Sequence, residues 1–223
     1  MLTTDPNHNA GQSLRQAAAA GDLATLQQLL DAGATVDPLD NAALRWAVRH
    51  RQAEAVGVLL EAGAPLEPYA EEFLTLAARN GDARTLDLLL ASLPEPRDPE
   101  LLNRLLLLAV ESENIPATVN LLRLGADPSA KDNEALMLAA CGGDVPMLRL
   151  LREHDVDFRA RNSQALCNAV VAPSPEATKY LLQEGVDPQA QRGIPLQFAI
   201  MCSTPECRLP CPNGWWIAPA KTQ

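Results

Sequence analysis

The chain has 223 residues, of which 47% are hydrophobic but only 4% are aromatic, and its formal net charge is −10 at pH 7. This acidic balance argues against nucleic acid or an anionic membrane as the main partner. No apolar run is long enough for a membrane-spanning helix, and the composition suits thin layers of alanine and leucine.

The N-terminal segment MLTTDPNHNAGQ lacks the basic start and apolar stretch of a secretory signal peptide. The five cysteines, three of them bunched near the C-terminus, do not form the spread framework of a disulfide-stabilised secreted protein. We therefore expect a cytoplasmic protein with reduced thiols. We expect residues 1–11 to form a flexible leader.

A short pattern then recurs seven times. A leucine is followed three and four residues later by small or branched apolar residues, as Leu14 is by Ala17 and Ala18. The step is thirty residues each time except once, when it is thirty-two. A fixed period of this size predicts a stacked repeat architecture, which offers a long binding surface rather than one enclosed pocket. The anchor leucines are Leu14, Leu44, Leu74, Leu106, Leu136, Leu166 and Leu196.

Each repeat predicts a pair of helices. With the anchor leucine as position 0, positions 0, +3 and +4 share one face of a first helix. Glycine at +7 in three repeats can end that helix in a left-handed conformation. A second helix with a leucine doublet comes next and usually ends at glycine. Good N-caps for it stand at +8, namely Asp22, Asp82, Asn114, Asp144 and Ser174.

The pattern resembles the ankyrin repeat. The core Leu-x-x-Ala-Ala-x-x-Gly-Asp is matched in the first, third and fifth repeats, and Gly125-Ala126-Asp127-Pro128 matches the family's loop. The resemblance covers residues 12–202. It implies an all-α, ankyrin-type α-solenoid of six full helix-turn-helix repeats plus a partial seventh, and a role in binding proteins.

The repeats depart from the family in one respect. The usual Thr-Pro-Leu-His opening is absent, and the unit is about three residues shorter than the typical length of about 33. We expect the hairpin to be shortened to a tight loop begun by Asn or Asp, which tolerate left-handed geometry. Short-hairpin ankyrins of this kind occur in bacterial and viral proteins, and we expect the bacterial type here.

Two segments interrupt the repeat. Residues 93–99 contain three prolines, which favour a rigid, extended connection over a site for a proline-motif ligand. Residues 203–223 form an atypical tail with Trp215 and Trp216. This tail either caps the last repeat or is partly disordered, and we favour capping.

No catalytic constellation or cofactor motif is present. His8, His50 and His154 lie in different registers, which favours solvent-facing side chains. Cys202, Cys207 and Cys211 have metal-like spacing but no obvious fourth ligand. We therefore expect no enzyme activity, no cofactor and no bound metal.

The residues at position +2 point away from the packed face of the first helix and should line the concave side of the stack. They are Gln16, Trp46, Leu76, Leu108, Leu138, Asn168 and Phe198. Alternatively, these residues pack sideways on neighbouring repeats. At +5, Arg49 and Arg79 lie beside this stripe, and with Arg45 and His50 they would form a basic patch centred on Trp46.

These observations predict a non-enzymatic, monomeric module that binds another protein through its concave first-helix surface. An acidic or carboxylate-rich segment suits the basic patch, and an inhibitor, immunity-like or effector role fits equally. The alternatives are a scaffold for a metal- or redox-active tail and a purely structural spacer. The predicted binding residues are Trp46, Arg49, His50, Leu76, Arg79, Leu108 and Leu138.

Overall fold

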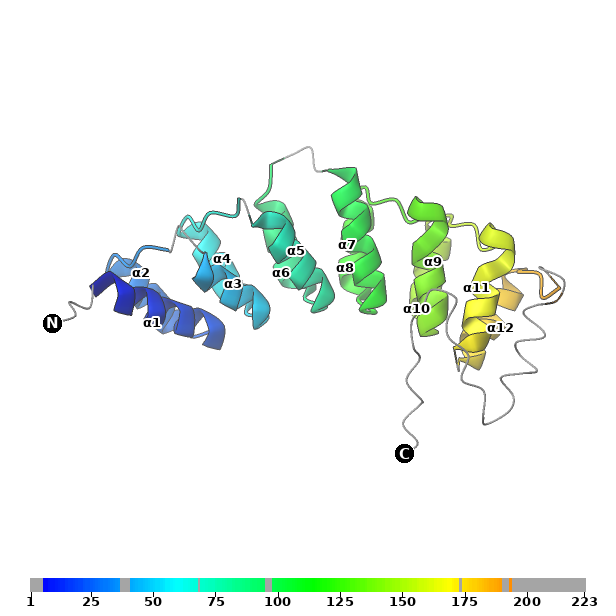
Figure 1. The fold of residues 1–223 in the computed structure, drawn as a ribbon, viewed down its shortest axis with the longest axis horizontal. Coiled ribbons are helices and arrows are strands. Elements are labelled where there is room, and N and C mark those ends of the chain that lie inside the picture. Colours follow the sequence, from blue (N-terminus) through cyan, green and yellow to red (C-terminus); the bar gives the residue numbers. More distant parts are fainter. Residues whose placement is uncertain are drawn as a thin grey trace, which may run out of the picture. The chain divides into compact units, whose positions relative to one another are not determined.

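The structure is a computed structural model, and it describes residues 6–36, 41–67, 69–94, 98–172, 174–189 and 193. Within these ranges the chain forms twelve α-helices and no strand (Figure 1). The helices come one after another as six pairs, which confirms the prediction of an all-α fold built from six helix-turn-helix repeats. The anchor of the seventh repeat, Leu196, lies outside the described residues. The chain divides into two compact units, Met1–Asn120 and Leu121–Gln223.

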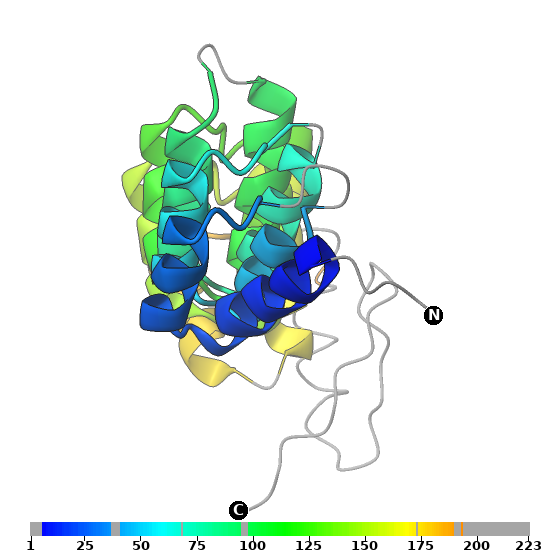
Figure 2. The ribbon, with the colours of Figure 1, turned by 90° about the vertical axis from the view of Figure 1, so that its left-hand side faces the viewer.

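The first unit consists of two layers of helices. The first helices of the repeats, α1, α3, α5 and α7, pack side by side in one layer, and α2, α4 and α6 form the second. Figure 2 shows the blue and cyan helices of this unit in two columns. The bounds are α1 Pro6–Ala20, α2 Leu23–Asp31, α3 Ala42–Arg49, α4 Ala53–Glu61, α5 Ala70–Arg79, α6 Ala83–Ala91 and α7 Pro99–Glu111.

The second unit repeats this arrangement. Its first helices, α9 and α11, pack against each other, as do its second helices, α10 and α12. The boundary between the units falls inside α8, which runs from Ile115 to Arg123. The remaining bounds are α9 Ala130–Gly142, α10 Val145–Glu153, α11 Ala160–Val171 and α12 Pro175–Gln183.

The residues that the repeat pattern predicts to form the core are buried. All six described anchor leucines are at most 1% exposed, and the alanines at +3 are also buried. Small side chains at +3 and +4 let the first helices approach closely, and the leucines fill the space between layers. The second helix is less regular, because the doublet Leu89 and Leu90 is buried whereas Leu182 is 43% exposed.

The predicted caps also hold. Asp22, Asp82 and Asp144 each accept a hydrogen bond from the backbone N–H three residues later, at 3.0–3.1 Å. Asn114 and Ser174 do the same at 3.2 and 3.4 Å. Each side chain therefore satisfies a backbone donor that the first turn of a helix leaves without a partner.

The turns at the start of α3 and of α9 are tight and left-handed, as their Asn and Asp residues predict, whereas Tyr69 before α5 and Asp98 before α7 have negative φ. Asn41 has φ +44° and ψ +35°. In the fifth repeat, the consecutive residues Lys131, Asp132 and Asn133 have φ +50°, +61° and +63°, so the turn is a short stretch of left-handed backbone. This compact turn replaces the longer hairpin of the usual ankyrin repeat.

Three further expectations concern the ends and the linker. The first helix begins at Pro6, so it includes part of the segment that we expected to be a flexible leader. In the linker, Asp98 accepts from the backbone N–H of Glu100 and Pro99 starts α7. The tail from 203 lies outside the described residues.

In the described part of the chain, no helix is both long and apolar enough to cross a membrane.

Candidate functional site

The predicted binding residues of the first unit lie on three helices that pack side by side, α3, α5 and α7. Their anchors face the core, so positions +2 and +5 of each helix point elsewhere. The side chain of Trp46 is 42% exposed, the leucines are partly exposed, and the charged side chains are exposed. We call this surface the first-helix patch, and it comprises Trp46, Arg49, His50, Leu76, Arg79 and Leu108.

Trp46 is the centre of a stacked cluster. The His50 ring lies nearly parallel to the indole, with 5.2 Å between ring centroids and 12° between the planes. The Arg49 guanidinium carbon lies 5.9 Å from the indole centroid. Residues three and four apart are neighbours on a helix, so local geometry brings the three side chains together. Cation–π attraction and stacking restrict their rotamers, which leaves an exposed aromatic surface bordered by positive charge.

Arg45 does not contribute to the basic patch as we expected. Its Nε lies 3.2 Å from one carboxylate oxygen of Glu72, and its Nη2 donates to the other at 3.2 Å. Its guanidinium carbon also lies 5.2 Å from the centroid of the Tyr69 ring. The charge of Arg45 is therefore paired with a carboxylate on α5, in the next repeat, which lowers its contribution to the predicted basic patch.

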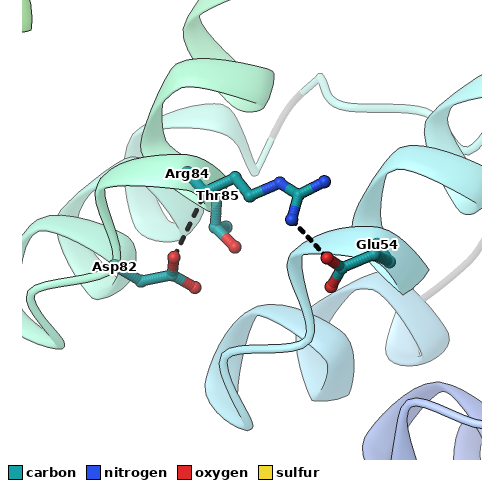
Figure 3. Close-up of polar contacts among 4 residues, drawn as sticks. All are labelled: Glu54, Asp82, Arg84 and Thr85. Carbon is teal, nitrogen blue, oxygen red and sulfur yellow. Dashed lines mark hydrogen bonds and ion pairs between the residues drawn. The ribbon is translucent and has the colours of Figure 1, made fainter.

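Similar polar contacts join the second helices of adjacent repeats. Arg84 of α6 forms an ion pair with Glu54 of α4 (Figure 3). Asn120 of α8 donates to Asp87 of α6 at 2.7 Å, and desolvation by burial raises the pKa of this carboxyl. The repeat pattern alone did not reveal these contacts.

Two more ion pairs join adjacent repeats. Arg104 of α7 pairs with Glu71 at 2.7 Å, and in the second unit Arg152 pairs with Glu184 at 2.9 Å. All the bridging partners are 27 to 33 residues apart. Opposite charges separated by about one repeat are therefore the sequence signal that could have identified them.

Among the described residues, the arginines of the first-helix patch do not form such ion pairs with a neighbouring repeat. Within the part of the chain that the structure describes, neither Arg49 nor Arg79 has a carboxylate within ion-pair distance. In contrast, Arg45, Arg84 and Arg104 are each paired across a repeat boundary. Positive charge that is available to a ligand therefore lies beside Trp46, on an otherwise acidic protein.

Comparison with known proteins identifies the family. The family model described as ankyrin repeats (3 copies) matches residues 106–192. The solved ankyrin-repeat domain of Bcl-3, described as a unique member of the IkappaB protein family, has the same fold with a TM-score of 0.61. It is 26% identical in sequence, and the match covers 84% of this chain and 93% of that one. Residues 106–192 are ankyrin repeats, and the described helices form an ankyrin-type solenoid. No curated protein sequence matches the chain. The ankyrin-repeat fold is a scaffold for protein–protein interaction, and this likeness supports such a role here.

In the second unit, position +2 differs between the two first helices. Leu138 is partly exposed, like Leu76 and Leu108, whereas Asn168 is only 2% exposed. The Asn168 amide donates to the carbonyl of Met137 at 3.3 Å and accepts from Gln164 at 3.1 Å. In α11 the side chain at +2 therefore packs sideways on the neighbouring repeat, which is the alternative that the sequence left open. Phe198 lies outside the described residues.

The structure also locates several of the side chains that could bind a metal or react. In the described part of the chain, no group of three or more His, Cys, Asp or Glu side chains could hold a metal ion. Burial raises the pKa of the Cys167 thiol, which disfavours the reactive thiolate. His154 is exposed, as expected. The predicted cysteine cluster at Cys202, Cys207 and Cys211 lies outside the described residues.

Proposed function

We propose that this chain is a non-enzymatic module that binds another protein through the first-helix patch of its first unit. The observation that carries the proposal is the cluster of Trp46, Arg49 and His50, an exposed aromatic ring beside a cation without an ion-pair partner among the described residues. Tryptophan buries a large area on binding, and arginine donates hydrogen bonds in a fixed fork. Both are enriched at positions that dominate binding energy.

The charge of the patch favours an acidic or carboxylate-rich partner segment. In the described part of the chain, Arg49 and Arg79 have no intramolecular carboxylate to compete with such a segment. The chain as a whole is acidic, with a net charge of −10, and so repels nucleic acid and anionic membranes. Complementary charge at the patch would guide the partner to this surface and not to others.

The proposed mechanism is rigid recognition by a monomer in the cytoplasm. Buried anchor leucines hold the repeats that carry the patch, and stacking on His50 restricts Trp46, so little side-chain freedom is lost when the partner binds. A rigid surface of this kind serves an inhibitor or immunity-like protein and an effector equally well. Assay of the partner's own activity with and without the chain distinguishes these roles.

Comparative affinity capture from the native host tests the proposal. The wild-type chain and the double variant Trp46→Ala with Arg79→Glu are used as bait, and co-purifying proteins are identified by mass spectrometry. A matched control changes Leu182 to Ala and Lys179 to Glu, two exposed positions on α12 that carry a similar truncation and the same change in charge. We expect a partner that the wild type and the control retain and the patch variant loses. Equal recovery by all three baits would move the site away from the patch.

A further inference from the structure

The exposed charged residues at position +5 of α3, α5 and α7 form a row with a definite order of signs. Arg49 of α3, Arg79 of α5 and Glu111 of α7 occupy the same register of three helices that pack side by side, and all three are exposed. The turns after the first and third of these helices repeat the signs, because Arg51 follows α3 and Glu113 follows α7, and both are exposed. The row is therefore positive, positive, negative over three consecutive repeats. A complementary ligand must be negative, negative, positive.

The spacing of the row selects the backbone conformation of such a ligand. Packed helices lie about 8–10 Å apart, so successive charges recur at about this interval. A polyproline II segment has about three residues per turn and rises about 3.1 Å per residue, which places every third side chain on one face at about 9 Å. In a β-strand the third residue points to the opposite face. An α-helix needs about six residues per step, and these end about 240° around its axis.

The apolar residues beside the charged row also favour a ligand in the polyproline II conformation. Trp46, Leu76 and Leu108 occupy position +2 on the same three helices, and Trp46 is 42% exposed. Polyproline II ligands dock on aromatic surfaces, where their preformed conformation reduces the entropy lost on binding. An exposed indole next to partly exposed leucines offers such a surface to the residues between the charged ones.

Resting on the proposed function, we propose that the first-helix patch binds a proline-rich segment of a protein partner in the polyproline II conformation. The segment carries acid, acid and base at every third residue. The two carboxylates pair with Arg49 and Arg79, and the cation pairs with Glu111. The chain direction of the segment is not fixed by the charges, because the order can be matched from either end.

Two end-capped peptides of identical composition test the charge order. The matched peptide is Glu-Pro-Pro-Glu-Pro-Pro-Lys, and the mismatched peptide is Glu-Pro-Pro-Lys-Pro-Pro-Glu, which matches the row in neither direction. Calorimetry at low salt should show that the wild-type chain prefers the matched peptide by at least about fivefold, since two exposed charge pairs change from attractive to repulsive. Salt should weaken this preference.

A charge swap on the protein provides the decisive control. The double variant Arg79→Glu with Glu111→Arg keeps the net charge but makes the row positive, negative, positive. It should now prefer the mismatched peptide by a similar factor. Both exchanged residues are exposed, and melting curves establish that the variant folds.

The outcomes separate this inference from the proposed function. If the wild-type chain binds both peptides equally and Trp46→Ala abolishes this binding, the proposed charge order is wrong but the patch remains the binding site. No peptide binding, in a protein whose partner still requires Trp46, would overturn the inference alone. Peptide binding that Trp46→Ala leaves unchanged would overturn the inference and count against the proposed function as well.

Discussion

Asn41 has two roles in the loop before α3. Its backbone is left-handed, at φ +44°, and its fully buried side chain donates to the carbonyl of Pro65 in the loop of the next repeat. Asparagine tolerates the left-handed region better than most other residues with a side chain, because its short amide can hydrogen-bond locally. One residue thus shapes the short loop and ties it to its neighbour.

A pair of substitutions separates these roles. Asn41→Gly removes the hydrogen bond but suits the backbone, whereas Asn41→Ala removes the bond and adds left-handed strain of about 1–2 kcal/mol. We expect both to lower the free energy of unfolding, since a buried carbonyl without a partner costs about 1–3 kcal/mol. Alanine should be worse than glycine by about 1 kcal/mol in urea titrations. Equal losses would show that the backbone is not strained there.

Asp87 provides a prediction about pH. Desolvation by burial raises the pKa of this carboxyl, although Asn120 donates a hydrogen bond to it. A raised pKa in the folded state means that stability is lost as the pH rises through it and the carboxyl ionises. Asp87→Asn keeps an acceptor for Asn120 and carries no charge. Its melting temperature should therefore exceed the wild-type value at pH 7, and the difference should shrink below about pH 4. A difference that does not change with pH would reject this explanation.

At the residue scale, the sequence predicts features set by helical register but not those set by pairing between repeats. The exposure of Trp46 could be predicted, because position +2 points away from the anchor leucines. Arg45 precedes it in the chain, yet its side chain reaches Glu72 on the next repeat. Which of several surface carboxylates an arginine reaches depends on the packing of two helices, and the local pattern does not contain that information.

At the scale of the element, two of the polar contacts of α6 should differ in strength; Figure 3 shows both. Asp82 is 8% exposed and accepts from the backbone N–H of Thr85 at 3.1 Å. Arg84 pairs with Glu54, but both side chains are more than half exposed. Capping satisfies a backbone donor that has no other partner, whereas an exposed ion pair is screened by water.

Alanine substitutions should reveal this inequality. We expect Asp82→Ala to lower the free energy of unfolding by about 1 kcal/mol through loss of the cap. Arg84→Ala should cost less than about 0.5 kcal/mol, and salt should reduce even that effect. Chemical denaturation at two salt concentrations measures both. A larger loss for Arg84→Ala would mean that the ion pair between repeats, and not the cap, stabilises α6.

The elements were more predictable than their loops. The anchor leucines, the glycine ends and the Asp, Asn and Ser caps placed the helices, since each rests on local backbone chemistry. The Asn and Asp residues also predicted left-handed loops. They did not predict that Lys131 would share this conformation with Asp132 and Asn133. Lysine has no intrinsic preference for it, and closure of the short loop between packed helices imposes it.

At the scale of the whole molecule, the repeats of a solenoid contact only their neighbours, so stability should be a sum of repeat and interface contributions. In the first unit, Leu74 of α5 lies between two neighbouring first helices, α3 and α7. Leu14 of α1 is just as buried, but among the described first helices of this unit α1 packs against α3 alone. A deletion at an end can be relieved by fraying, whereas one in the middle cannot.

Leu74→Ala should therefore lower the free energy of unfolding by about 2–5 kcal/mol, the usual cost of a cavity in a packed core. Leu14→Ala should cost clearly less. Urea titrations monitored by circular dichroism measure both losses. If the two variants lose the same amount, the repeats unfold as one cooperative block and the nearest-neighbour description is wrong.

The first-helix patch should bind the partner without being needed for the fold. Calorimetry of the captured partner with the variant Trp46→Ala and Arg79→Glu measures this, with Leu182→Ala and Lys179→Glu as the control. We predict wild-type melting for both variants, an unchanged Kd for the control and a Kd at least about thirtyfold weaker for the patch variant, since one hot-spot residue contributes about 2 kcal/mol or more. A folded patch variant with the wild-type Kd would show that the partner binds elsewhere.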